Sequence, residues 1–289
     1  MRAVVSLVLL TTVAVGFQPT APADRFFDSQ GVRIRYVERG QGPPVVLIHG
    51  YTGDVERHWV APGVLADLSK EYRVVALDCR GHGKSDKPVD PNAYGAAMAA
   101  DIVRLLDHLA IPRAHLVGYS MGAMIVGHLL ATHADRVLSA TFVASHPVRT
   151  WTAADEEDAE AWARDLESDT PFRKLILEVS PPGAPPREED INKLSQRLVA
   201  ANDVRALAAY HRGRSTLAVT DAQLAAVRVP ALGIIGTEDP SVQGMRDVKA
   251  VMPALTLVVV GGATHGGERG IMRQPAFLES LRRFLAGVR

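Results

Sequence analysis

The stretch Gly118-Tyr119-Ser120-Met121-Gly122 decides the fold of this chain. It follows the apolar run Leu116-Val117 and precedes apolar residues at helical spacing, so it joins a predicted strand to a predicted helix. In this context a G-x-S-x-G sequence indicates a tight turn that lifts the serine hydroxyl out of the sheet. Glycines are needed two positions before and after the serine, because larger side chains would collide with neighbouring backbone. Ser120 is therefore the predicted nucleophile, at a helix N-terminus where amide groups favour negative charge.

Outward from this turn, short apolar runs alternate with helical patterns. Continuous apolar runs of this length are typical of parallel strands that are covered on both faces. They lie at residues 45–48, 74–77, 115–117, 137–144, 232–235 and 255–260. Between them, apolar residues recur at the spacing of helices, as over 102–109 and 277–285. This alternation predicts a mostly parallel α/β sheet with helices on both faces.

The region 146–228 interrupts the alternation, because it contains no convincing buried strand. It holds an acidic helix-like stretch at 155–158, a Pro-rich break at 180–186 and further helical patterns. The acidic stretch is typical of a solvated helix face. We therefore expect a core of residues 24–145 and 229–289, with a helical cap or lid at 146–228 inserted between its two parts. His146 and His211 fall in this insertion, and nothing in the sequence supports a substrate-contacting role for them.

A serine hydroxyl needs a base to take its proton, and the chain has ten histidines. His265 follows the last apolar strand pattern, in the loop Gly262-Ala263-Thr264-His265. Most of the others fall in predicted helices, at the start of a strand or in the insertion. His265 is the predicted base.

The base in turn needs a carboxylate that fixes its tautomer and stabilises the imidazolium. The strand pattern at 232–235 ends in Gly236-Thr237-Glu238-Asp239-Pro240. Pro240 favours an extended conformation at Asp239, and the chain order Ser120, Asp239, His265 is typical of this kind of sheet. Asp239 is the predicted acid, with Glu238 as the alternative and Asp247 as a more distant one.

Acyl transfer also needs two N–H donors for the developing oxyanion. The amide of Met121, next to the nucleophile, is one candidate. The second is most readily supplied by Tyr51, in the segment His49-Gly50-Tyr51-Thr52 that follows the strand pattern at 45–48. We expect the His49 imidazole to be a structural hydrogen-bonding group.

Composition excludes several other classes of function. Lys and Arg number 32 and Asp and Glu also number 32, so no basic excess favours nucleic acid or an anionic membrane. The single cysteine rules out an intramolecular disulfide and a Cys-based zinc cluster. A phosphate-binding loop would need glycine at position 78, where Asp78 stands, and a dinucleotide motif fails at Asp86. We expect no cofactor, no metal and no nucleic-acid partner; the oligomeric state is not predicted.

The first residues have the pattern of a leader. One basic residue precedes an apolar run over 3–17, and a small-x-small site lies at Ala21-Pro22-Ala23. This is typical of a signal peptide, and the run is shorter than a membrane-spanning helix requires. Residues 1–23 are therefore a predicted signal peptide of an exported (periplasmic or secreted) protein with no stable membrane insertion afterwards. An uncleaved anchor or a disordered extension is the alternative.

Taken together, the motifs resemble those of the α/β-hydrolase superfamily, close to its small esterase- and haloperoxidase-like branch. The matching segments keep the family's order over residues 25–289: 49–50, 78–85, 118–122, 236–239 and 262–265. The resemblance implies an α/β-hydrolase fold with a mostly parallel eight-stranded sheet, helices on both faces and a helical cap. It also implies a triad of Ser120, Asp239 and His265, an oxyanion hole from Tyr51 and Met121, and a structural role for the 78–85 loop.

The expected function is hydrolysis of small, largely uncharged carboxylic esters through an acyl-enzyme on Ser120. A C–C bond hydrolase, a lactonase or a perhydrolase with the same triad is the first alternative. A non-catalytic hydrolase-like binding protein is the second. Relatives of this fold that cleave carbon–halogen bonds or epoxides use an aspartate as nucleophile, which Ser120 excludes, and the insertion holds only Tyr210 where an epoxide hydrolase needs two tyrosines.

Overall fold

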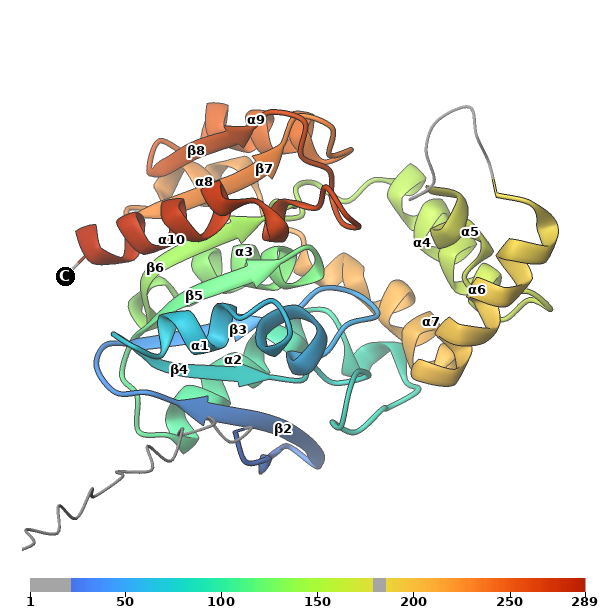
Figure 1. Ribbon diagram of the computed structural model, residues 1–289, viewed down its shortest axis with the longest axis horizontal. Helices are drawn as coiled ribbons and strands as arrows, with labels where there is room; N and C mark the ends of the chain where they lie inside the picture. Colours follow the sequence, from blue (N-terminus) through green and yellow to red (C-terminus); the bar gives the residue numbers. More distant parts are fainter. Residues whose placement is uncertain (1–21, 179–185, 289) are drawn as a thin grey trace, which may run out of the picture.

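The computed structural model describes residues 22–178 and 186–288. Its eight strands form one sheet in the order β1-β2-β4-β3-β5-β6-β7-β8, shown in Figure 1. The pairs β1–β2 and β2–β4 are antiparallel, and every other pair is parallel. The predicted fold class is thereby confirmed. The strands are β1 Arg25–Ser29, β2 Val32–Arg39, β3 Pro44–Ile48, β4 Arg73–Leu77, β5 Ala114–Tyr119, β6 Val137–Val143, β7 Ala231–Gly236 and β8 Leu255–Val260.

Helices cover both faces of this sheet, because its central strands are apolar on both sides. One buried apolar cluster joins the sheet to α2, α3, α8 and α9, and a second joins it to α1 and α10. The α-helices of the sheet domain are α1 Val64–Leu68, α2 Ala96–His108, α3 Met121–Thr132, α8 Asp221–Ala226, α9 Val242–Val251 and α10 Pro275–Gly287. Single turns of other helix types are η1 Glu56–Val60, η2 Pro91–Ala93, η3 Ala134–Arg136, η4 Arg214–Leu217 and η5 Ile271–Arg273.

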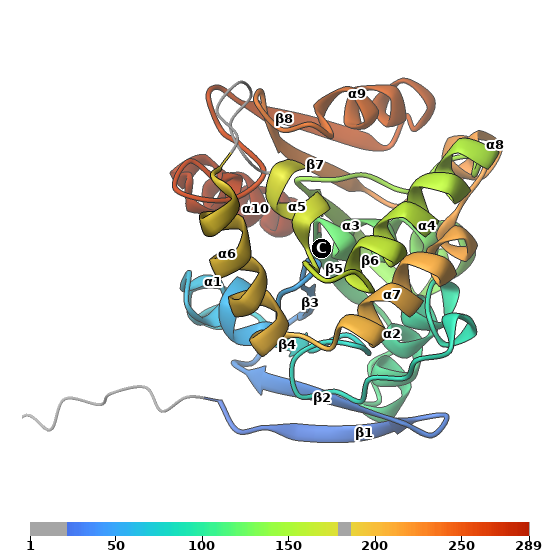
Figure 2. The same ribbon diagram turned by 90° about the vertical axis from the view of Figure 1, so that its right-hand side faces the viewer.

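The cap consists of four helices between β6 and β7: α4 Ala153–Leu166, α5 Arg173–Glu178, α6 Glu188–Ala201 and α7 Val204–Gly213. They lie beyond the carboxyl ends of the parallel strands, to one side of the sheet (Figures 1 and 2). Their own apolar cluster includes the fully buried Phe172. Helix α8 also falls within 146–228, but its Leu224 packs into the cluster of the sheet domain.

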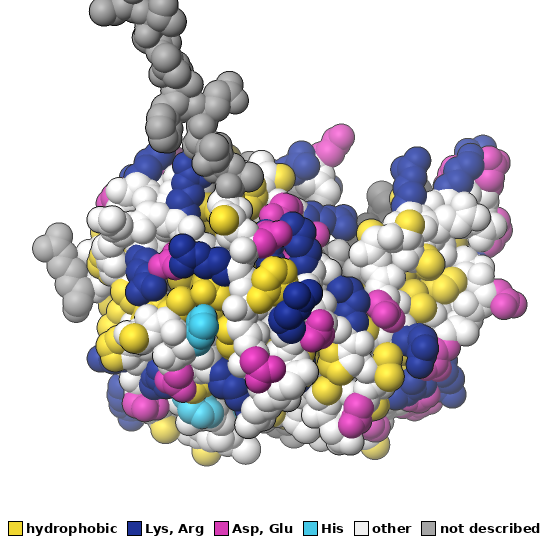
Figure 3. All heavy atoms as spheres, turned by 90° about the horizontal axis from the view of Figure 1, so that it is seen from below, with side chains coloured by type: hydrophobic (Ala, Val, Ile, Leu, Met, Phe, Trp, Pro, Cys, Tyr) yellow, Lys and Arg dark blue, Asp and Glu magenta, His cyan; other side chains and the backbone are white. Residues whose placement is uncertain are grey.

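The predicted signal peptide lies almost wholly outside the described residues, and so does most of the Pro-rich break at 180–186. Among the described residues, no helix has the length and apolar character needed to cross a membrane. On the face shown in Figure 3, basic and acidic side chains are interspersed, in keeping with the equal numbers of the two kinds.

Candidate active site

Ser120 lies in the turn between β5 and α3, with φ 52° and ψ −112°. A positive φ is rare for a residue with a side chain and stores strain, which surrounding contacts must hold. The glycines on either side permit the turn. A Cβ on Gly118 would lie 2.2 Å from the carbonyl oxygen of Gly122, and one on Gly122 would lie 2.1 Å from that of Ile48. Glycine is therefore required at positions 118 and 122 because the backbone there packs directly against other backbone atoms.

The structure brings the three predicted triad residues into one hydrogen-bonded chain. His265 Nε2 lies 2.9 Å from Ser120 Oγ, and His265 Nδ1 lies 3.0 Å from Asp239 Oδ2. Because an ionised carboxylate only accepts, Nδ1 carries the proton and Nε2 is free to take the proton of the serine. The second oxygen of Asp239 accepts a hydrogen bond of 2.8 Å from the Ser241 amide. The arrangement is that of a nucleophile, a base and an acid that orients the base.

The geometry also separates Asp239 from the two other carboxylates. The side chain of Asp239 is fully buried and faces His265. Glu238 is 48% exposed and forms an ion pair of 2.8 Å with Arg269, and Asp247 accepts a hydrogen bond from Gln243 on α9. Of these three carboxylates, Asp239 is the one that contacts His265, the predicted base.

The loop that carries His265 is held by Tyr119, which sequence reasoning did not single out. Its hydroxyl donates a hydrogen bond of 2.9 Å to the His265 carbonyl oxygen. Burial raises the pKa of Tyr119 to about 12, so the hydroxyl remains a donor near neutral pH. The residue directly before Ser120 thus also holds the backbone of His265, a link over 146 positions of sequence that no local pattern shows.

Tyr51 lies in the loop after β3, beside Ser120. A Cβ on Gly50 would lie only 3.1 Å from the Cβ of Ser120, so the Gly50–Tyr51 peptide borders the elbow. Its carbonyl oxygen accepts from His49 Nδ1 at 2.8 Å and from the Gly53 amide at 3.1 Å. In a trans peptide the N–H points away from the carbonyl oxygen. These bonds therefore fix the direction of the Tyr51 amide, the predicted oxyanion donor.

Two backbone contacts determine the tautomer of His49. The Cys79 amide can only donate, and it lies 2.9 Å from His49 Nε2. The Gly50 carbonyl can only accept, so Nδ1 carries the proton. Burial lowers the pKa of His49, which keeps the ring neutral. His49 therefore has a structural contact of the kind expected from the sequence: its ring donates to the Gly50 carbonyl oxygen and so orients the Gly50–Tyr51 peptide, which carries the predicted N–H donor.

Met121 supplies the other predicted donor as the first residue of α3. Its amide follows Ser120 directly at the amino end of the helix, where backbone N–H groups lack helical acceptors. Within the described ranges, no backbone hydrogen bond from the amides of Tyr51 or Met121 is present. Both predicted donors are therefore available to an oxyanion.

His58 is a second contact that the sequence did not reveal. The Gly50 amide donates to His58 Nδ1 at 3.2 Å, and the His58 ring packs against Tyr119 with centroids 4.9 Å apart. Burial is the main cause that lowers the pKa of His58 to about 3. In the sequence His58 follows the charged residues Glu56 and Arg57, a pattern typical of a solvated segment. Only the tertiary structure shows that His58 supports the loop that contains Tyr51.

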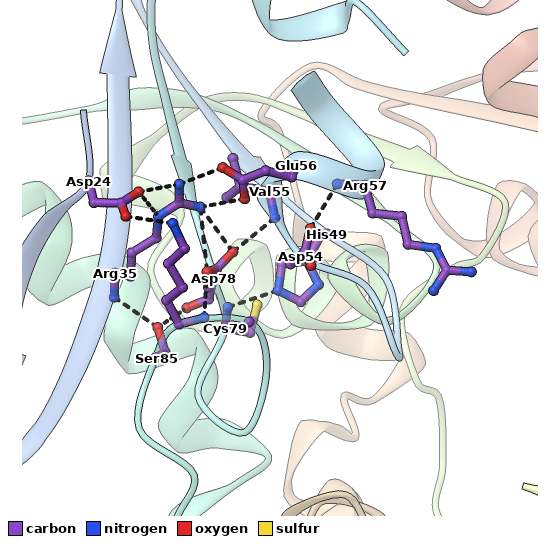
Figure 4. A network of polar contacts seen from close by, with 12 residues as sticks. Asp24, Arg35, His49, Asp54, Val55, Glu56, Arg57, Asp78, Cys79 and Ser85 are labelled. Carbon is purple, nitrogen blue, oxygen red and sulfur yellow. Dashed lines mark hydrogen bonds and ion pairs between the residues drawn. The ribbon is translucent and has the colours of Figure 1, made fainter. Parts of the chain in front are cut away.

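A network of charged groups anchors the loop after β4 (Figure 4). The buried Asp78 carboxylate accepts from the amides of Val55 at 2.9 Å and Lys84 at 2.8 Å, and it lies 3.4 Å from the Arg35 guanidinium. Arg35 also pairs with Glu56 at 2.7 Å. These bonds tie β2, η1 and the 78–85 loop together. Asp78 therefore holds the backbone around the site and does not contact Ser120.

In the described part of the chain, no group of three or more His, Cys, Asp or Glu residues is placed to hold a metal ion. The chemistry that the site offers is that of its own side chains. A strained serine, a base oriented by a buried acid and two free amides are the parts needed for covalent acyl transfer.

Fold and site together define an α/β protein with a nucleophile elbow. The family model described as the alpha/beta hydrolase fold matches residues 43–267, and the chain belongs to this family. It is similar to 3-oxoadipate enol-lactonase 2 from Acinetobacter baylyi, with 30% identity over 229 residues, 73% of this chain and 78% of the relative.

Other similarities are shorter or more distant. The chain is 39% identical over 129 residues to the dihydrolipoyllysine-residue acetyltransferase component of the acetoin cleaving system from Cupriavidus necator. That match covers 44% of this chain and 33% of the relative. An esterase from Thermogutta terrifontis has a similar structure, with a TM-score of 0.74 and 24% identity over 93% of this chain and 99% of the other. The last likeness supports the fold alone.

Proposed function

We propose that this protein hydrolyses carboxylic esters through an acyl-enzyme on Ser120. The observation that carries the proposal is the continuous hydrogen-bonded chain from Ser120 through His265 to the buried Asp239. A non-catalytic binding protein would need neither a base in contact with the serine nor a strained turn that presents the hydroxyl.

In the first half-reaction, His265 Nε2 takes the hydroxyl proton while Ser120 Oγ attacks the ester carbonyl carbon. The carbonyl oxygen becomes an oxyanion that the amides of Tyr51 and Met121 stabilise. His265 then gives the proton to the leaving alcohol oxygen as the carbon–oxygen bond breaks. The products of this half are the free alcohol and an acyl ester on Ser120.

In the second half-reaction, water replaces the alcohol and the same groups act again. His265 takes a proton from water, and the resulting hydroxide equivalent attacks the acyl carbon. The tetrahedral intermediate collapses, His265 returns the proton to Ser120 Oγ and the carboxylic acid leaves. Asp239 remains ionised throughout and stabilises the imidazolium in both halves.

Lactone hydrolysis is a second candidate, because a lactone is an internal ester and needs no further group. The similarity to an enol-lactonase over 73% of this chain favours it over C–C bond cleavage and perhydrolysis. The ester and lactone reactions differ in where the alcohol goes. After lactone opening the alcohol remains part of the product, whereas an open-chain ester releases it.

The test compares the wild type with Ser120→Ala on p-nitrophenyl esters of graded acyl length and on a matched series of lactones. We expect the wild type to hydrolyse at least one series and Ser120→Ala to lose about four to six orders of magnitude in kcat. Equal turnover by the two proteins would overturn the assignment of Ser120. The series with the higher kcat/KM decides between ester and lactone.

We also propose that the chain is exported, on the strength of the leader pattern at 1–23. Expression in a bacterial host, fractionation and N-terminal sequencing test this. A periplasmic or secreted protein that begins near Asp24 is expected. A cytoplasmic protein that retains residues 1–23 would contradict export, and a membrane-bound protein that retains them would indicate an anchor.

A further inference from the structure

The side chain of Tyr51 leaves the site and enters the contact between sheet domain and cap. Its ring packs against the apolar cluster of the sheet domain and also against that of the cap. It lies 5.0 Å from the ring of His211 on α7 and 6.3 Å from that of Trp162 on α4, measured between centroids. The ring of His82, in the 78–85 loop, lies 6.2 Å away. The backbone amide of Tyr51 is thus the predicted oxyanion donor, while its side chain belongs to a cluster of polar aromatic side chains under the cap.

The polar atoms of this cluster lack partners. Tyr51 Oη, His82 Nε2 and both ring nitrogens of His211 are buried and have no hydrogen-bond partner among the described residues. Buried polar groups are nearly always paired, because an unmade hydrogen bond costs about 1–3 kcal/mol. The Tyr51 hydroxyl and the three such atoms on the rings beside it therefore indicate that something else pairs with them.

The donors and acceptors define what that partner is. His82 Nδ1 donates to the Arg80 carbonyl oxygen at 3.1 Å, so His82 Nε2 can only accept. Burial lowers the pKa of His211 well below its usual range, so this ring is neutral and offers one donor and one acceptor. The Tyr51 hydroxyl can do both. A group that satisfies all three must itself donate and accept, as an alcohol hydroxyl does.

The charges around the cluster disfavour an ionic group of either sign. Burial is the main cause that raises the pKa of the Tyr51 hydroxyl; the charge of Asp165 adds to the shift and that of Arg214 opposes it, so charges of both signs lie near this hydroxyl. Arg214 and Lys174 both lower the pKa of His211, so a bound ammonium would meet the same positive field. Both cations are themselves paired with Asp158, at 3.0 and 3.1 Å. A neutral hydroxyl is therefore the best match.

We infer that Tyr51, His82 and His211 form a subsite that binds a hydroxyl group on the acyl part of the substrate. The inference rests on the proposed ester hydrolysis. His265 must protonate the leaving oxygen, so the alcohol part lies on the side of His265. The acyl part then extends past the Tyr51 amide toward the Tyr51 ring.

The test compares two esters that differ by one hydroxyl, ethyl hexanoate and ethyl 6-hydroxyhexanoate. We expect the wild type to have a kcat/KM at least about tenfold higher for the hydroxy ester, because the plain ester leaves the polar atoms of the subsite unpaired. His211→Leu and Tyr51→Phe should each reduce this ratio toward unity. Tyr51→Phe keeps the backbone amide, and it provides a second reading if His211→Leu does not fold.

Tyr94→Phe is the matched control, because its hydroxyl donates to the Pro88 carbonyl at 2.6 Å and not to the cluster. It should keep the wild-type ratio. A wild type without preference, or a ratio that His211→Leu and Tyr51→Phe leave unchanged, would overturn the subsite and indicate bound water in its place.

Calorimetric titration of Ser120→Ala with the two esters separates this inference from the proposed function. If the wild type cleaves neither ester, the proposed function fails on these substrates, yet binding still decides the subsite. Tighter binding of the hydroxy ester that is lost on adding His211→Leu supports it. Equal binding of the two esters overturns it.

Discussion

Tyr51 lies between the groups around Ser120 and the groups around its own ring, and these two regions differ in whether their polar atoms have hydrogen-bond partners. At the elbow, His265, Asp239 and His49 each have partners on both sides. Under the cap, Tyr51 Oη, His82 Nε2 and both nitrogens of His211 have none among the described residues. Where the polar atoms of a site are hydrogen-bonded to one another, their geometry is fixed before substrate binds. Where buried polar atoms have no protein partner, they can form hydrogen bonds with a ligand.

The two regions also differ in what builds them. The elbow is formed by backbone packed against backbone, as at Gly118 and Gly122. The cap side is formed by side chains from α4 and α7 that meet the 49–52 and 78–85 loops. Substitutions at the elbow should therefore abolish the reaction or the fold, and those under the cap should change which substrate is preferred.

The largest expected effect separates Asp239 from its neighbour. Asp239→Asn should reduce kcat by about four orders of magnitude, because an amide at this position favours the wrong tautomer of His265. Glu238→Gln, the matched control, should stay within about twofold, because Glu238 is exposed and pairs with Arg269. Steady-state kinetics on one ester measures both. Comparable losses in the two variants would contradict the assigned acid.

The next effect concerns pH and two buried histidines, His58 beside the elbow and His82 under the cap. The pKa values of His58 and His82 are lowered to about 3, mainly by burial, so between about pH 6.5 and 3 the unfolded chain binds up to two more protons than the folded one. The stability they contribute is full above pH 6.5 and is lost as pH falls. Together they should remove about 3.3 kcal/mol of unfolding free energy between pH 6.5 and 5.

Urea denaturation at pH 8, 6.5, 5.5 and 5 measures this slope. His58→Gln removes one proton-binding side chain and should reduce the slope by up to about 1.4 kcal/mol per pH unit. A slope that stays the same in this variant would show that His58 titrates alike in both states, against the burial described above.

A smaller effect on stability tests the backbone contact at the elbow. Gly122→Ala places a methyl group against the Ile48 carbonyl, with no side-chain rotation to relieve the clash. We expect a loss of about 3 kcal/mol in unfolding free energy. Gly287→Ala, where nothing lies within 4 Å of the added carbon, should stay within about 0.5 kcal/mol. If the two variants lost the same unfolding free energy, the contact with the Ile48 carbonyl would not explain the glycine at position 122.

The smallest effect concerns the loop of the base. Tyr119→Phe removes the hydrogen bond to the His265 carbonyl, which should cost about 1 kcal/mol and reduce kcat by up to about tenfold with little change in KM. Tyr36→Phe is the control, since its hydroxyl contacts His108, away from Ser120. A larger change in KM than in kcat would place Tyr119 in substrate binding instead.

The contrast between the two regions also explains how far the sequence could predict the site. Ser120, Asp239 and His265 lie at or shortly after the ends of β5, β7 and β8, and such positions can be found because strand ends and tight turns have local patterns. The choice of Asp239 over Glu238 required the tertiary structure, since both precede Pro240 within two residues and only burial separates them. The fold class followed from the same local patterns.

Tyr119, His58 and the Tyr51 cluster could not be predicted in this way. Their contacts join residues far apart in the chain, such as Tyr119 with the His265 loop or Tyr51 with His211 on α7. No periodicity marks the partners, because their positions depend on how the cap lies against the sheet domain. His211 had no feature in the sequence that separates a ligand-binding histidine from one buried for packing.

The most direct test of the central claim is to identify the atom that becomes acylated. The purified protein would be treated with an alkyl fluorophosphonate, which reacts with activated serines, and analysed by intact mass and peptide mapping. We predict one adduct per chain, on the peptide that contains Ser120, and no adduct on Ser120→Ala. An adduct on another residue, or equal labelling of the two proteins, would contradict the account.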